Sequence, residues 1–231
     1  MASEIENDGK RKEGKNVGGQ GLSDTQSGVP RWPGAAALLS IGASYLALSD
    51  YVTVVPRFWL PGLMVVLVTI LLIAHARGHY RLARAISFAL LGVVTISLVL
   101  REFFLVTTLS GRGTSAFSVL VDAVLIWVST VVTFAVWYWE IDGGGPDERA
   151  RETHASEDFL FPQITQQDGK EAIGWAPDFL DYLFVSSTTS ATFGPTDTPV
   201  LSRRGKVLMV VQCMLSLVVV IVLVAWAVDT L

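Results

Sequence analysis

The sequence predicts an all-α, polytopic membrane protein with about five transmembrane helices and a short re-entrant or interfacial helix before the last one. Of its 231 residues, 51% are hydrophobic and only 16% are charged, whereas a soluble domain carries about 25% charged residues. The mean hydropathy is +0.50. Five stretches are apolar on all sides and approach the roughly 20 residues that a bilayer core requires. Strands of a membrane barrel would alternate apolar and polar residues instead.

The composition also argues against several classes of function. The net charge of −4 provides no basic surplus for binding nucleic acid. Cys213 is the single cysteine, so an intrachain disulfide cannot form. The sequence contains no nucleophile elbow, P-loop, H-E-x-x-H or C-x-x-C motif. We therefore predict no enzymatic activity, no cofactor, no metal site and no nucleic-acid partner.

Residues 1–31 form a polar segment in which charged residues are followed by a stretch rich in Gly, Ser and Gln. Such a composition cannot bury enough apolar surface to fold, so we predict a disordered N-terminal tail. No apolar region directly follows the charges, which argues against a secretory signal.

Residues 32–140 are predicted to contain four spans, at Trp32–Val55, Phe58–Ala76, Leu82–Val106 and Ser115–Trp139. The first span is diluted by serines and by Asp50. Within it Ala36, Ser40 and Ser44 recur every four residues, a small-residue stripe that allows another helix to approach closely. The fourth span ends in the triplet WYW, and such rings prefer the headgroup level. The last span, Val207–Val228, contains no charge.

Residues 141–174 form an acidic hydrophilic loop between the fourth and the last spans. The longer segment 141–181 contains ten acidic side chains and only three basic ones. A loop of this charge could dock a soluble partner.

The distribution of Lys and Arg predicts the orientation in the membrane. With the N-terminus in the cytoplasm, fourteen of the 17 Lys and Arg residues lie inside, and only Arg57, Arg101 and Arg112 lie outside. We therefore expect a multi-pass protein of the cell (plasma or inner) membrane with a cytoplasmic N-terminus.

Residues 175–231 combine a short helix with the last span. Pro177 and Asp178 suit a helix start, and the amphipathic run Phe179–Ser187 is too short to cross a bilayer. Hydroxyl side chains and a glycine follow this run. A short helix that ends in such residues between two spans is typical of a re-entrant pore loop, which we predict over Ser186–Asp197. Its carbonyl and hydroxyl oxygens could replace the water shell of an ion. The candidate pore-loop residues are Thr188, Thr189, Ser190, Thr192, Phe193, Gly194 and Asp197.

Three elements of the C-terminal half carry a resemblance. They are WYWE at Trp137–Glu140, DFLFPQ at Asp158–Gln163, and Tyr182–Thr198, which ends in P-T-D-T. Through them, residues 137–229 resemble the C-terminal half of a family of uncharacterised bacterial polytopic membrane proteins. The resemblance implies a membrane protein and no established activity.

Residues 189–195, TSATFGP, are more remotely similar to the T-T-V-G-Y-G-D filter of potassium-channel-like proteins, with Thr189, Phe193 and Gly194 at matching positions. Thr192 stands where the filter has a glycine, and Pro195 stands where it has an acidic residue. The similarity implies a homo-oligomer around a monovalent cation, because one loop cannot ring an ion. The segment also fits an interfacial amphipathic helix whose hydroxyls cap turns.

Two polar side chains inside the predicted spans are candidate functional residues, Asp122 and Gln212. A carboxylate inside a span is costly, so Asp122 is a candidate proton carrier or ion ligand. The alternative is that Asp122 lies at the membrane interface. Gln212 is expected to hydrogen-bond to a neighbouring helix.

We predict an integral membrane protein with channel-like ion permeation through the loop at 186–197. The alternative is a non-transporting scaffold or assembly subunit whose acidic loop docks a soluble partner.

Overall fold

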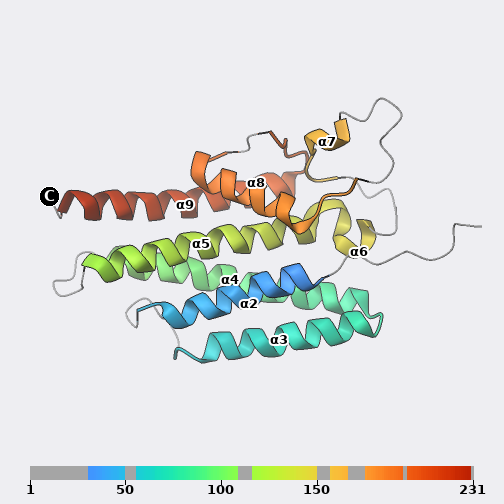
Figure 1. The fold of residues 1–231 in the computed structure, drawn as a ribbon, viewed down its shortest axis with the longest axis horizontal. Coiled ribbons are helices and arrows are strands. Elements are labelled where there is room, and N and C mark those ends of the chain that lie inside the picture. The colour runs from blue at the N-terminus through green and yellow to red at the C-terminus, as the bar shows by residue number, and fades with distance from the viewer. Residues whose placement is uncertain are drawn as a thin grey trace, which may run out of the picture.

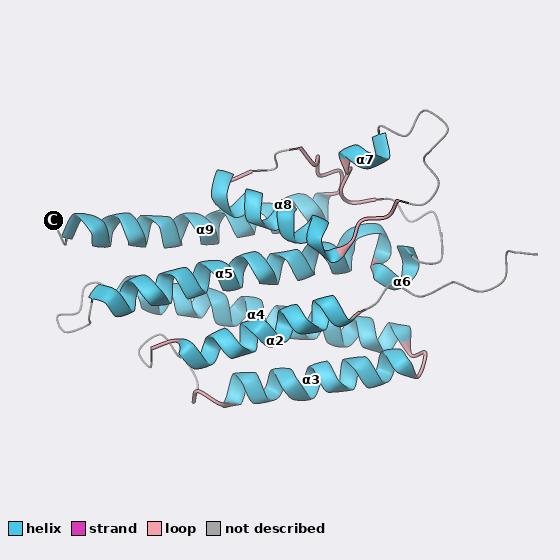
Figure 2. Cartoon of the chain, in the orientation of Figure 1, coloured by secondary structure: helices cyan, strands magenta, loops and turns pink. Residues whose placement is uncertain are grey.

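The computed structural model describes residues 31–49, 56–108, 116–149, 157–165, 175–194 and 197–229. These residues are helical apart from connections and one isolated bridge between Phe159 and Val200 (Figure 2). The long helices are α2 (Trp32–Ala47), α3 (Trp59–Ala76), α4 (Tyr80–Thr108), α5 (Ala116–Ile141) and α9 (Arg203–Asp229). The short ones are η2 (Asp142–Gly144), α6 (Pro146–Arg149), α7 (Pro162–Thr165) and α8 (Phe179–Thr192). The predicted all-α class is confirmed for the described residues. The predicted disordered tail, residues 1–31, and much of the acidic loop lie outside the described residues. Arg31, at the end of that tail, is an exception: the prediction of disorder is wrong for it, because it is buried and paired with Glu140 and Asp147.

Among the described residues, four helices, α3, α4, α5 and α9, are long and apolar enough to cross a membrane. Helix α2 has only 16 residues, which span about 24 Å at 1.5 Å per residue, less than a hydrocarbon core of about 30 Å. The predicted number of five spans is therefore not confirmed. Helix α2 ends at Ala47 rather than at Val55, because Leu48 is extended and the backbone N–H of Ser49 donates to the carboxylate of Asp122 (3.1 Å).

The long helices carry many large apolar side chains on the outside of the bundle. Examples that are between 43% and 63% exposed are Val65, Ile70, Ile96, Met214 and Ile221. Several polar side chains are instead fully buried, among them Thr130, Thr133, Gln212 and Ser216. This distribution is the reverse of that in a soluble domain, and it fits a protein that is solvated by lipid and whose helices join through small and polar residues.

Helix α5 is the central helix of the bundle (Figure 1). It packs against α2, α4, α8 and α9. In the 18-residue apolar stretch of α5, 61% is buried inside the protein, compared with 28% to 33% in the corresponding stretches of α3, α4 and α9. Its side chains contribute to one core shared with α2, α3 and α4 and to a second core shared with α8 and α9. Helix α5 therefore joins the N-terminal helices to the C-terminal pair.

Most of the polar connections gather at one end of the bundle, which we call the polar end. Figure 1 shows the start of α2, the connection between α3 and α4, and α6 and α7 at this end. Helix α9 starts near the end of α5, as a hydrogen bond from Arg204 Nη2 to the backbone oxygen of Ile141 (3.0 Å) shows. The described segments that the Lys and Arg count assigns to the cytoplasm thus share the polar end.

Helices α2 and α5 approach each other closely at a glycine that was not part of the predicted small-residue stripe. Ala36 and Ser40 of that stripe are exposed, and Ser44 Oγ lies 3.0 Å from Ser129 Oγ. At Gly34, an added Cβ atom would lie 2.5 Å from the ring of Trp139. Close packing at this point therefore depends on the absence of a side chain at Gly34.

Candidate functional site

Helix α8 lies beside α5 and α9, and the chain that follows it returns to the polar end (Figure 1). The return is fixed by backbone hydrogen bonds, in which the Leu160 N–H donates to Pro199 O (2.9 Å) and the Leu201 N–H donates to Asp158 O (2.8 Å). We call the segment from Asp178 to Leu201 the α8 hairpin. It contains the predicted pore loop.

A capping box starts α8. The Asp178 carboxylate accepts from the backbone N–H groups of Leu180 (2.8 Å) and Asp181 (3.2 Å), and the Asp181 carboxylate accepts from the backbone N–H of Asp178 (2.8 Å). This arrangement satisfies amides that have no partner within the helix. The predicted role of Asp178 at the helix start is confirmed, whereas Pro177 lies before the N-cap and outside the first turn. The helix ends where Phe193 adopts the left-handed conformation (φ 58°), directly before Gly194.

One side of α8 is fixed to α5 and α9 by a cluster that we call the polar core: Tyr138, Ser186, Ser190, Gln212 and Ser216. Gln212 Nε2 lies 2.8 Å from both the carbonyl and the hydroxyl oxygen of Ser186 and 2.7 Å from Ser190 Oγ. The Tyr138 hydroxyl donates to Gln212 Oε1, and Ser216 Oγ lies 2.9 Å from Ser190 Oγ. Gln212 therefore makes the interhelical hydrogen bonds that the sequence predicts.

The threonines of the predicted pore loop bond to their own helix. Thr188 Oγ1 donates to Phe184 O (3.0 Å), Thr189 Oγ1 to Val185 O (2.7 Å), and Thr192 Oγ1 to Thr188 O (2.8 Å). Thr189 is fully buried, like Ser190 of the polar core.

The exposed part of the predicted pore loop is what we call the hairpin tip: Thr192, Phe193, Gly194 and Asp197. Three of these residues are exposed in the single chain and Gly194 is partly exposed, while residues 195 and 196 lie outside the described part. The structure thus divides the seven predicted residues into a buried group, which packs the hairpin, and an exposed group at the tip.

A second set of polar residues, the base cluster, holds the start of the hairpin: Asp142, Asp158, Tyr182 and Arg204. Asp142 accepts from the backbone N–H groups of Asp158 (2.7 Å) and Phe159 (3.2 Å) and from the Tyr182 hydroxyl (2.6 Å). Arg204 forms a forked ion pair with Asp158, with N–O distances of 2.7 and 2.6 Å. Burial raises the pKa of the Tyr182 phenol, and the charge of Asp142 acts in the same direction.

The three sequence elements Trp137–Glu140, Asp158–Gln163 and Tyr182–Thr198 meet around the α8 hairpin. Asp158 and Tyr182 come from two of them and join in the base cluster through Asp142. Tyr138 comes from the third and joins the polar core. Asp142 and Asp158 belong to the predicted acidic hydrophilic loop, yet both are buried, with exposed fractions of 2% and 1%.

Charged groups are also buried within α4 and α5. Asp122, predicted as an intramembrane polar residue, is 1% exposed and accepts from the Ser49 N–H. Arg101 is fully buried, with its guanidinium 4.2 Å from the ring centroid of Tyr45, and Glu102 is 4% exposed. Arg101 is thus buried between helices, whereas the Lys and Arg count predicts a position outside the membrane. The predicted span Leu82–Val106 already continues past both charges, and α4 extends to Thr108.

Comparison of the chain with models of protein families, with curated proteins and with solved structures finds no match. The chain's own geometry therefore carries the functional argument.

Proposed function

We propose that the protein is an oligomeric, channel-like membrane protein whose α8 hairpin enters the bilayer from the cytoplasmic side as a re-entrant loop. The observation that carries this proposal is the course of α8, which packs along the candidate spans α5 and α9 before the chain returns to the polar end. Fourteen helical residues extend about 21 Å, so the hairpin tip would lie inside a hydrocarbon core of about 30 Å.

At that depth the hairpin tip needs a polar surrounding. The chain after Phe193 is not helical, and Asp197 is exposed. Non-helical backbone at membrane depth is tolerated only where protein buries it or where it lines a water-filled cavity. A carboxylate that faces lipid costs about 2.5–3.5 kcal/mol on insertion scales. Further copies of the chain, arranged around an aqueous pathway, would satisfy both requirements.

The hydrogen bonds of α8 narrow the groups that could line such a pathway. Ser186 and Ser190 are engaged in the polar core and Thr189 is buried. At the tip the Asp197 carboxylate is exposed. The Thr192 hydroxyl donates to the Gly194 carbonyl (3.0 Å), and the lone pairs that both oxygens keep could serve as further ligands. The negative charge of Asp197 favours a cation, and we propose a monovalent cation as the permeant ion.

Cation flux into liposomes tests this proposal. Purified protein is reconstituted, and uptake of K⁺ or Na⁺ down an imposed gradient is followed with an ion-sensitive dye. We expect flux above that of protein-free liposomes, a reduced preference for cations over anions in Asp197→Asn, and an altered rate in Phe193→Ala. Leu180→Ala is the matched control, because Leu180 is a 67% exposed residue of α8 outside the hairpin tip. Absence of flux from folded, cross-linkable oligomers would contradict permeation.

One observation favours the alternative, a non-transporting scaffold or assembly subunit. The α8 hydroxyls make intramolecular hydrogen bonds, so the hairpin would have a purely structural role. The acidic loop would then dock a soluble partner through acids other than Asp142 and Asp158, which are buried in the base cluster. Absence of flux, together with stoichiometric binding of one soluble protein that is lost in Asp168→Asn/Glu171→Gln, would support it.

A further inference from the structure

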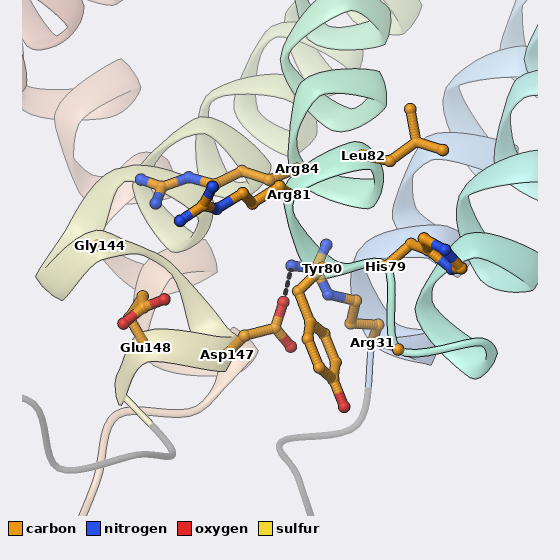
Figure 3. A pocket seen from close by; sticks show the side chains of 10 residues that line it. Arg31, His79, Tyr80, Arg81, Leu82, Arg84, Gly144, Asp147 and Glu148 are labelled. Carbon is orange, nitrogen blue, oxygen red and sulfur yellow. Dashed lines mark hydrogen bonds and ion pairs between the residues drawn. The ribbon is translucent and has the colours of Figure 1, made fainter.

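A pocket of about 610 Å³ lies at the polar end, between the start of α4 and the turn that joins α5 to α6 (Figure 3). Three arginines line it, Arg31, Arg81 and Arg84, and so do Tyr80, Gly144 and Asp147. The pocket is separate from the hairpin tip, and nothing in the permeation proposal uses it.

Arg81 and Arg84 form the cationic part of this pocket. They are three residues apart on α4 and therefore share one face of the helix, and Figure 3 shows both guanidinium groups extending from α4 toward the turn that carries Gly144. Within the described part of the chain, neither guanidinium forms an ion pair or a hydrogen bond. The Arg84 guanidinium lies 5.5 Å from the ring centroid of Phe88. The two charges thus lack an anionic partner among the residues that the structure describes.

The acids near the pocket are already engaged. Asp147 accepts from Arg31 Nη2 (2.5 Å) and lies 3.6 Å from His75 Nδ1, while Glu140 accepts from Arg31 Nη1 (3.2 Å). Glu148, the other acid of the pocket, also has an interaction partner. The Arg31 side chain is only 2% exposed, and its Nε has no hydrogen-bond acceptor among the described residues. The pocket therefore contains cationic N–H groups that these acids do not satisfy.

The backbone adds further positive potential. Helix α4 begins at Tyr80, so its first-turn amides, which have no acceptor within the helix, and the positive end of its dipole lie at the pocket. Gly143, Gly144 and Gly145 follow one another with φ angles of 55°, 84° and 98°, a conformation that glycine adopts readily. This turn places no side chain at the edge of the pocket formed by Gly144.

We propose that this pocket binds a phosphate group, presented by the headgroup of an anionic lipid. Forked guanidinium groups and helix N-terminal amides are the groups that recognise phosphate oxygens. Tyr80 and Leu82 are 38% and 53% exposed beside the pocket and would contact the apolar part of the lipid. A soluble phosphate anion would use the same polar groups, so the test separates the two sources.

The experiment measures binding to the purified full chain in neutral detergent. Short-chain phosphatidylglycerol, phosphatidylcholine and inorganic phosphate are titrated separately, and thermal stabilisation and apparent Kd are recorded. The site variant is Arg81→Gln/Arg84→Gln. The matched control is Arg77→Gln/Arg203→Gln, which removes the same charge from exposed positions outside the pocket. We expect phosphatidylglycerol to bind most tightly and the site variant to bind it about tenfold more weakly or worse, as the loss of a charge-assisted hydrogen bond predicts.

Equal affinity in the site variant and the wild type would overturn the proposal, and so would an equal loss in the control. Inorganic phosphate that binds as tightly as phosphatidylglycerol, through the same arginines, would overturn the lipid assignment and identify a soluble anion. If the glutamine variant does not fold, Arg81→Lys/Arg84→Lys replaces it. Lysine keeps the charge and loses the forked geometry, so we expect weakened binding, and an unchanged Kd would contradict the proposal.

Discussion

Replacement of Gln212 by methionine tests whether the polar core holds α8 against the bundle. Gln212 is fully buried, and methionine has a similar length and volume but cannot donate a hydrogen bond. The substitution leaves the Tyr138 hydroxyl without its acceptor and removes the side-chain donor to the Ser186 carbonyl. Helix packing should therefore be weakened with little change in shape.

The expected magnitude follows from the number of hydrogen bonds that Gln212 can make at once. Three acceptor atoms lie within reach of Nε2, but an amide nitrogen has only two hydrogens. Two donated bonds and the one accepted from Tyr138 make three. Interhelical hydrogen bonds in membrane proteins contribute about 0.6 kcal/mol each, so Gln212→Met should lower the free energy of unfolding by about 2 kcal/mol.

The assay is reversible unfolding in mixed micelles with increasing sodium dodecyl sulfate, followed by tryptophan fluorescence. Met214→Leu is the matched control, because Met214 is a 58% exposed residue of the same helix, and its free energy of unfolding should stay near that of the wild type. Combining Gln212→Met with Tyr138→Phe should give less than the sum of the two single losses, since both remove the same bond. Wild-type stability in Gln212→Met, or strict additivity with Tyr138→Phe, would refute the role of the polar core.

Three further substitutions test the base cluster and the contact between α2 and α5. Arg204→Ala leaves the buried Asp158 carboxylate without its forked partner and should lower the free energy of unfolding by about 2 kcal/mol. This is less than for a fully buried pair, because Arg204 is half exposed. The same dodecyl sulfate titration measures the effect, and a loss below about 0.5 kcal/mol would contradict a stabilising role of the pair. Burial raises the pKa of Tyr182 above its unfolded value of about 10, so its protonated form stabilises the fold below about pH 10 and this contribution is lost as the pH rises. Thermal melts from about pH 8 to 11 should therefore show a smaller alkaline decline in Tyr182→Phe than in the wild type. Gly34→Ala places a Cβ atom 2.5 Å from the ring of Trp139 and should lower the free energy of unfolding by about 1–3 kcal/mol. At Gly62 an added Cβ atom has no other atom within 4 Å, so Gly62→Ala should be neutral or stabilising. Equal effects of the two substitutions would argue against close packing at Gly34.

The long helices could be predicted because lipid imposes a simple rule on sequence. A span must be apolar over about 20 residues and satisfy its own backbone, and the predicted span Phe58–Ala76 differs by one residue from α3. The end of α2 could not be predicted in this way. It depends on a tertiary contact between the Ser49 amide and the Asp122 carboxylate. These residues are far apart in the sequence, and a local residue pattern does not predict which distant residues form such a contact.

The cap of α8 and the base cluster show the same contrast for the candidate site. The start of α8 was predictable, because the cap at Asp178 is a local interaction. The base cluster was not, because Asp142 and Tyr182 are forty residues apart and an acid in a hydrophilic loop is usually solvated. The hydroxyls of α8 suggested ligands for an ion, and the structure instead shows Ser186 and Ser190 bonded to Gln212. Whether a hydroxyl faces a neighbouring helix or open space depends on packing, which spacing alone does not specify.

The depth of the α8 hairpin in the bilayer tests the central proposal most directly. Cysteines are introduced singly at Leu180, Phe184, Phe193 and Leu201, which are all exposed, in a background that replaces the single cysteine by Cys213→Ala. Each is spin-labelled in lipid nanodiscs, and its collisions with oxygen and with a water-soluble nickel complex give its depth. A re-entrant hairpin predicts a depth that increases from 180 to 193 and decreases again at 201. One shallow depth at all four positions would show a helix lying flat on the membrane surface and would contradict the proposal.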